Sequence, residues 1–128
     1  MNVLLEVSPG EALDKLTILN IKAARIADPA KLKNVAVERR SVEAAISRSI
    51  VVDAVLSELV ARLEEINGRL WDLEDEIRRF EATGDFGSGF IRTARQIYAT
   101  NDKRATVKRE ISLRFAGALI EEKGYTAY

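Results

Sequence analysis

The sequence predicts an all-α protein, an antiparallel helical bundle built on a long helical hairpin, with a short N-terminal strand. The first observation is a heptad pattern, in which apolar residues recur at alternating spacings of four and three. The second is a glycine-containing corner at residues 83–87, after which the same rhythm resumes in a segment free to fold back. The apolar positions of the heptad pattern are Val52, Leu56, Leu59, Leu63, Ile66, Leu70, Leu73, Ile77 and Phe80.

Two elements are expected at the start of the chain. Residues Val3–Val7 form a β-like run, whose backbone groups need a partner in either the Tyr-rich end at 125–128 or the same strand of a second chain. Ser8 can cap the amide of Glu11 and Glu11 can reach back to Ser8, which predicts a helix over Pro9–Ile26. This helix is apolar on more than one side, which is typical of a central or interface helix.

The next two helices follow from a cap and from the heptads. Asp28 precedes Pro29 and predicts a second helix that runs to about Ser47. Residues 47–51 are then the turn into the long helix, which is predicted from Val52 to Ala82. On its outer face, pairs of acidic and basic residues four apart indicate exposure to water. Gly68 is expected to mark a close contact with another helix.

The last helix is predicted from Ser88, acting as its cap, to about Glu122. Phe86 lies in the corner before it and is expected to plug the end of the bundle. A continuous helix is favoured, because no Gly or Pro interrupts residues 88–116; a break would place a new cap at Asp102. The heptad positions that turn polar in this helix are Asn101, Arg104 and Lys108.

Composition excludes several classes of function. The 128 residues suggest one domain over 1–128, and the chain has neither Cys nor His, so disulfides, thiolate or imidazole metal sites and Ser-His catalysis are excluded. Twenty basic and twenty acidic residues cancel, which gives no general attraction to nucleic acid or to anionic membranes. With no apolar run of about 20 residues and no signal-peptide pattern, we expect a cytoplasmic protein.

A group of polar residues is expected to meet inside the bundle. In an antiparallel hairpin that turns near Gly84, residue 72 lies opposite roughly residue 97, and the first helix can add its polar edge. The cations could bind phosphate or carboxylate, although interhelical salt bridges that fix the register are the favoured interpretation. The candidate ligand-binding residues are Asp14, Lys15, Trp71, Asp72, Asp75, Tyr98, Asn101, Asp102, Arg104 and Lys108.

Paired carboxylates offer an alternative site. Glu11 with Asp14, and Asp72 with Asp75, each lie three residues apart and share a helix face, where two such pairs could hold Mg²⁺. The all-α nucleotide pyrophosphohydrolases look similar, but the chain carries their E-x-x-E and E-x-x-D motifs only in part. A cofactor is therefore not expected, except for Mg²⁺ under this alternative.

Several motifs together resemble a family of small all-helical bacterial proteins described as a domain of unknown function. We associate this family with surface-polysaccharide gene neighbourhoods, and it brings no established activity to the chain. The resemblance spans nearly the whole chain and rests on residues 8–19 (SPGEALDKLTIL), 70–79 (LWDLEDEIRR), 85–87 (DFG), 97–104 (IYATNDKR) and 121–125 (EEKGY).

The sequence thus favours a non-enzymatic helical interaction or accessory protein that self-associates, most simply as a homodimer. The alternative is a protein that binds a small anionic molecule, such as a nucleotide or sugar phosphate, or a metal-dependent hydrolase that uses the polar pocket. Neither interpretation calls for a nucleic-acid or membrane partner.

Overall fold

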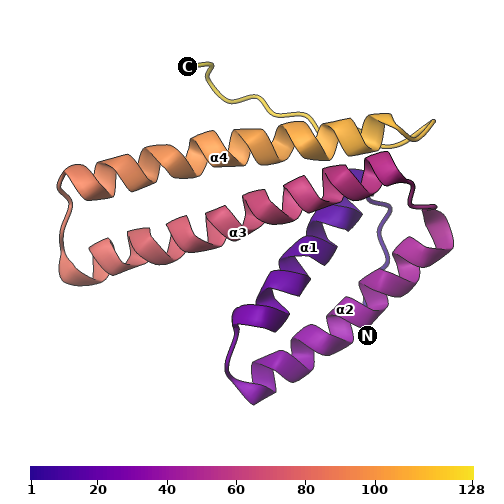
Figure 1. Ribbon diagram of the computed structural model, residues 1–128, viewed down its shortest axis with the longest axis horizontal. Helices are drawn as coiled ribbons and strands as arrows, with labels where there is room; N and C mark the ends of the chain where they lie inside the picture. The colour runs from indigo at the N-terminus through magenta and orange to yellow at the C-terminus, as the bar shows by residue number, and fades with distance from the viewer.

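The computed structural model describes residues 1–128 and contains four helices. They are α1 (Pro9–Arg25), α2 (Pro29–Ser49), α3 (Ala54–Thr83) and α4 (Ser88–Leu113). Figure 1 shows two hairpins, with α3 and α4 side by side along the long axis and the α1–α2 pair diverging from them. Helix α1 packs on all three other helices, whereas α2 packs along α1. The all-α fold, the long hairpin and the central position of the first helix are confirmed.

Helices α1 and α2 begin as the capping sequences predict. The Ser8 hydroxyl accepts a hydrogen bond from the Glu11 amide at 3.1 Å, and Pro9 is the first helical residue. The Asp28 carboxylate accepts from the Ala30 amide at 2.9 Å at the start of α2. The reciprocal half of the α1 capping box is absent, because the Glu11 carboxylate binds a cation of α4 instead. Helix α2 runs to Ser49, slightly beyond the predicted end.

The core forms where α1, the end of α2 and the start of α3 meet α4. Helix α3 begins at Ala54, two residues after the predicted start at Val52, because the Asp53 carboxylate caps the Leu56 amide at 2.8 Å. Val52 is exposed and lies outside the helix. The Asp53 carboxylate also pairs with Arg114 beyond the end of α4, at 2.6 Å. The buried core residues are Leu13, Ile46, Leu56, Leu59, Leu63, Val107 and Ile111.

The corner between α3 and α4 contains the predicted reversal but lacks the predicted plug. Gly84 adopts a left-handed conformation (φ 70°), which ends α3. Phe86 is 55 % exposed and packs edge-to-face on Phe90, so the expectation that it fills the end of the bundle is wrong. Gly87, rather than Ser88, precedes the first turn of α4, and no side chain caps that turn.

Helix α4 is continuous through Asn101, as favoured from the absence of Gly and Pro, but it ends at Leu113 and not near Glu122. Gly117 takes a positive φ of 74°, and the chain beyond it has no regular structure. Figure 1 shows this tail running back above α4. We call residues 119–128 the tail.

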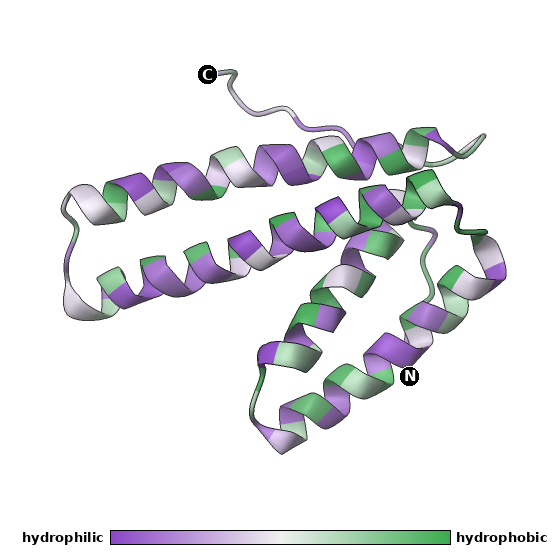
Figure 2. Ribbon diagram, viewed as in Figure 1, coloured by the Kyte–Doolittle hydropathy of each residue, from purple (hydrophilic) through white to green (hydrophobic).

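The predicted N-terminal strand is not formed. Residues 1–7 have no regular structure, and none of their backbone groups makes a hydrogen bond to another part of the backbone. The Tyr-rich end at 125–128 therefore does not pair with Val3–Val7, and pairing with a second chain stays a prediction. Figure 2 shows hydrophobic residues on this segment and on the loop between α2 and α3. No helix combines the length and the apolar stretch that crossing a bilayer requires.

Candidate functional site

The most buried carboxylate belongs to Asp14, in the middle of α1, a residue only 1 % exposed. Arg104 of α4 donates to it from Nε at 2.9 Å and from Nη2 at 2.5 Å, as a two-pronged fork. Asn67 of α3 donates from Nδ2 to Asp14 at 2.8 Å and to the Thr17 hydroxyl at 2.9 Å. The hydrogen bonds from Arg104 raise the pKa of that guanidinium further above its ordinary value. One carboxylate thus joins three helices.

Lys108 lies one helical turn after Arg104 and extends the same network. Its Nζ lies 2.6 Å from the Glu11 carboxylate, 3.4 Å from that of Glu121 in the tail, and 4.0 Å from that of Asp14. Burial alone would lower the pKa of Lys108, but the hydrogen bond to Glu11 and the neighbouring carboxylates outweigh it and raise the pKa. Lys108 is therefore a fixed cation at neutral pH.

Gly10 allows α1 to approach α4 this closely. Its amide donates to the Ser112 hydroxyl at 3.0 Å. A Cβ atom built at Gly10 would lie 2.2 Å from the Lys108 carbonyl oxygen and 2.8 Å from the Ser112 Oγ. Only glycine fits this contact, which brings the acidic residues of α1 within reach of the cations of α4.

A second group of predicted residues lines a cleft between α1 and the α3–α4 hairpin. Trp71 and Asp75 of α3 meet Asn101 and Arg104 of α4 there, around a volume of ≈ 540 Å³. The two helices thus bring these four residues to one surface, as the antiparallel register predicts.

Three of the other candidates are directed elsewhere. Asp72 forms an ion pair with Arg25 in the last turn of α1 and does not join the polar network around Asp14. Lys15 lies on the outer side of α1 and pairs with Glu38 of α2 at 3.0 Å. Tyr98 packs edge-to-face on the Tyr128 ring, with centroids 5.2 Å apart. Heptad spacing fixes which residues lie near a neighbouring helix, but the direction of each long side chain depends on the nearest opposite charge.

Asp102 binds the end of the tail. The Tyr128 hydroxyl donates to its carboxylate, and this hydrogen bond raises the pKa of Tyr128. Both Asp102 and Tyr128 are exposed, so the contact holds the tail against the outside of α4 rather than inside the bundle.

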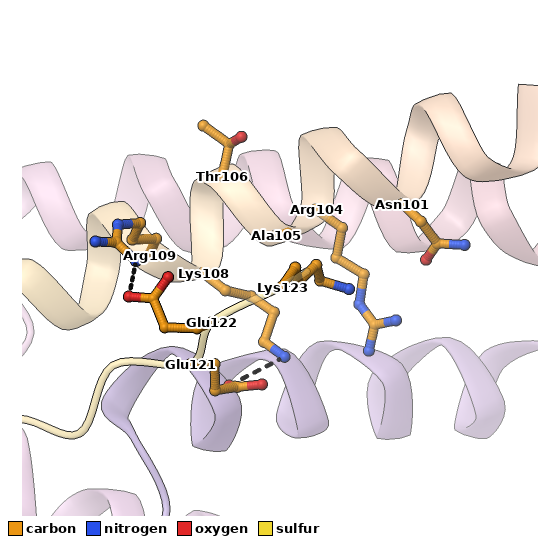
Figure 3. Close-up of a pocket in the computed structure, with 9 residues that line it drawn as sticks. All are labelled: Asn101, Arg104, Ala105, Thr106, Lys108, Arg109, Glu121, Glu122 and Lys123. Carbon is orange, nitrogen blue, oxygen red and sulfur yellow. Dashed lines mark hydrogen bonds and ion pairs between the residues drawn. The ribbon is translucent and has the colours of Figure 1, made fainter. Parts of the chain in front are cut away.

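The tail and α4 enclose a hollow of ≈ 270 Å³ (Figure 3). Glu121 reaches Lys108 from one side, and Glu122 accepts a hydrogen bond from Arg109 at 3.0 Å. Lys123 points into the same space and makes no ion pair with any carboxylate. The lining residues are Asn101, Arg104, Ala105, Thr106, Lys108, Arg109, Glu121, Glu122 and Lys123.

Sequence reasoning missed Asn67 and the tail. Asn67 lies four residues after Leu63 and three before Leu70, so its heptad position places it on the buried face, and this signal could have identified it. The contact of Glu121 with Lys108 had no comparable signal, because the tail has no periodicity and its path over α4 depends on tertiary structure.

The carboxylates proposed to hold Mg²⁺ do not gather at one point. Each of these carboxylates forms an ion pair with a cation of the protein: Glu11 and Asp14 with Lys108 and Arg104 of α4, Asp72 with Arg25, and Asp75 with Arg79. No group of three or more acidic side chains is close enough to hold a metal ion. The arrangement required by the hydrolase alternative is thus not present in this structure.

Comparisons with protein-family models, with curated proteins and with solved structures find no match for the chain. The resemblance to an uncharacterised bacterial family accordingly stays a prediction.

Proposed function

We propose that the chain is a non-enzymatic helical interaction protein, which self-associates as a homodimer through residues 1–7. The observation that carries this proposal is an exposed apolar segment without a partner. Val3, Leu4 and Leu5 are 73 %, 96 % and 78 % exposed. The backbone amides and carbonyls of the segment have no partner in the rest of the chain and are free to pair with another strand.

A second copy of the same segment suits this surface. In an extended chain alternate side chains share a face, which puts Leu5 and Val7 on one side and Leu4 on the other. Leu5 and Val7 line an apolar groove of ≈ 620 Å³, together with Val42 of α2 and Phe115 after α4. Antiparallel pairing of two such segments satisfies both backbones, and it brings together apolar surfaces from the two chains.

The polar network supports a structural role for the remaining candidate residues. The Asp14 carboxylate receives hydrogen bonds from Arg104 and Asn67, and the Glu11 carboxylate is held by Lys108. These groups join α1 to α3 and α4. A buried charge of this kind strongly destabilises the fold once its partner is lost. The network therefore stabilises the packing of these helices against one another.

Sedimentation velocity over a range of protein concentrations tests the proposal. Wild type should show a concentration-dependent dimer, and the double variant Leu4→Asp, Leu5→Asp should raise the dimer dissociation constant at least about tenfold, since burying two charges costs more than about 1.4 kcal/mol. Val37→Asp is the matched control, because Val37 is an exposed (56 %) aliphatic residue on α2 outside the segment. A monomeric wild type up to millimolar concentration, or a double variant that dimerises like wild type, would refute the proposal.

A further inference from the structure

The hollow between α4 and the tail holds more positive than negative side chains. Four of its lining residues are cations and two are carboxylates. Arg104, Lys108 and Arg109 each have a carboxylate partner in the protein, whereas Lys123 has none within 4.0 Å. The Lys123 ammonium lies over the Tyr125 ring, 5.6 Å from its centroid. One positive charge in the hollow is therefore left without a counter-charge from the chain.

Arg104 and Lys108 are half-buried, line the hollow, and retain N–H donors that the carboxylates of α1 do not use. Arg104 uses Nε and Nη2 for its fork to Asp14, while its Nη1 makes no hydrogen bond. Lys108 has three N–H donors; its short contact is with Glu11, and the contact with Glu121 is longer, at 3.4 Å. The network with α1 thus fixes these two cations, which also line the hollow together with Lys123 (Figure 3).

Glu121 has the features of a displaceable ligand of Lys108. Its side chain is 53 % exposed, and the chain beyond Ala118 makes no backbone hydrogen bond. Its carboxylate accepts from the Ser8 hydroxyl at 3.3 Å, near the upper limit for such a bond. A contact that is long, half-exposed and carried by an unstructured segment is worth about 0–1 kcal/mol and can be exchanged for a better one.

We propose that this hollow binds a small phosphate-bearing molecule, for which the carboxylate of Glu121 competes. The phosphate takes the place of Glu121 on Lys108, accepts from the free Nη1 of Arg104, and neutralises Lys123, which the tail brings to the site. Phosphate suits this set because a guanidinium fork and ammonium groups both bind its oxygens. The volume of ≈ 270 Å³ limits the ligand to a small one, since pockets for drug-sized molecules are roughly 300–1,000 Å³.

The site is independent of the dimer proposed above, because it lies on α4 and the tail, and residues 1–7 do not line it. Titration of the ¹⁵N-labelled full chain with inorganic phosphate, followed by amide chemical shifts, measures binding directly. Sodium chloride at equal ionic strength is the control for screening. Wild type should show saturable shifts at the amides of residues 119–125 and around Lys108 that chloride does not reproduce.

Single substitutions at exposed residues then distinguish the role of Glu121 as a competitor from that of Lys123 as a cation that binds phosphate. Glu121→Gln should bind phosphate two- to fivefold more tightly, as expected when a half-exposed competing charge pair is removed, and Lys123→Gln should bind about two- to fivefold more weakly. Lys33→Gln, which removes an exposed and unpaired lysine of α2, should bind like wild type. Sedimentation velocity on the same samples should show an unchanged dimer.

Three results would overturn the proposal. The first is the absence of saturable shifts in both wild type and Glu121→Gln. The second is an equal change in amide chemical shifts with phosphate and with chloride, which would show that the shifts come from ionic screening and not from binding. The third is an unchanged or weaker affinity in Glu121→Gln, which would make Glu121 a clamp that holds the tail and not a competitor.

Discussion

Substituting alanine at two glycines should change the stability of this protein in opposite directions. Gly10 lies where the first turn of α1 meets the backbone of α4, and Gly68 lies on an open face of α3. Alanine adds the same single carbon atom at both positions. The difference between the two variants therefore measures the tightness of the contact between α1 and α4.

The structure sets the size of the effect at Gly10. Its new Cβ atom would lie 2.2 Å from the Lys108 carbonyl oxygen, and real contacts of this kind are essentially never shorter than 3.0 Å, so the two backbones would have to part by 0.8 Å or more. That movement also stretches the 2.5 and 2.9 Å hydrogen bonds between Arg104 and Asp14. Overpacking of this type costs about 1–3 kcal/mol, which lowers Tm by roughly 3–12 °C.

Gly68→Ala is the matched control. Its Cβ atom would meet only the Arg25 guanidinium, at 3.7 Å, an ordinary van der Waals distance. Alanine in the middle of a helix is favoured over glycine by about 0.5–1 kcal/mol, so this variant should melt a few degrees higher than wild type.

Urea unfolding followed by circular dichroism gives the free energy of unfolding of both variants. All samples should have the same protein concentration, because dimerisation makes the apparent stability depend on it. A Gly10→Ala variant as stable as wild type would refute the reasoning. It would mean that α1 can move away from α4 without lowering the free energy of unfolding.

Three further predictions concern the charged groups. Arg104→Ala should lower the free energy of unfolding by about 3–5 kcal/mol, because it leaves the Asp14 carboxylate buried without its cation; a loss below about 1 kcal/mol in urea unfolding would contradict this. The pKa of Lys108 is raised in the folded protein, so its stabilisation is complete below its ordinary pKa and is lost as pH rises through the folded value; unfolding in urea from pH 9 to 12 should show a loss that Lys108→Gln reduces. The Leu56 amide lowers the pKa of Asp53, so its contribution is present above the ordinary pKa near about 4 and is lost as pH falls through the folded value; Asp53→Asn should have a flatter acid limb in thermal melts between pH 5 and 2.

The fold was largely predictable because its signals are local or periodic. Heptads in α3, the caps at Ser8 and Asp28, and the corner at Gly84 each act within a few residues, and the structure contains all of them. The N-terminal strand failed for the opposite reason. Its residues favour a strand, but a strand requires a partner and none is present within the chain.

The candidate site was predictable only in part. Register placed Asn101 and Arg104 near Trp71, and the network of Asp14 with Arg104 follows from charges on facing helices. Sequence could not show that Asp72 pairs with Arg25, because the two residues lie far apart in the chain and meet only where α1 crosses α3. It also could not place the tail, whose hydrogen bonds and ion pairs to the rest of the protein join side chains distant in the sequence.

The divergence of the two hairpins has a consequence for the distribution of stability along the molecule. Helix α1 makes polar contacts with α3 as far along as Asp72. Between Asp72 and the corner at Gly84, α3 packs only against the first half of α4. An isolated pair of helices buries one stripe on each partner, so amide protons near Gly84 should exchange with deuterium sooner than those around Leu63. The end of the α3–α4 hairpin near Gly84 can therefore open and close while the region where α1, α3 and α4 meet stays folded.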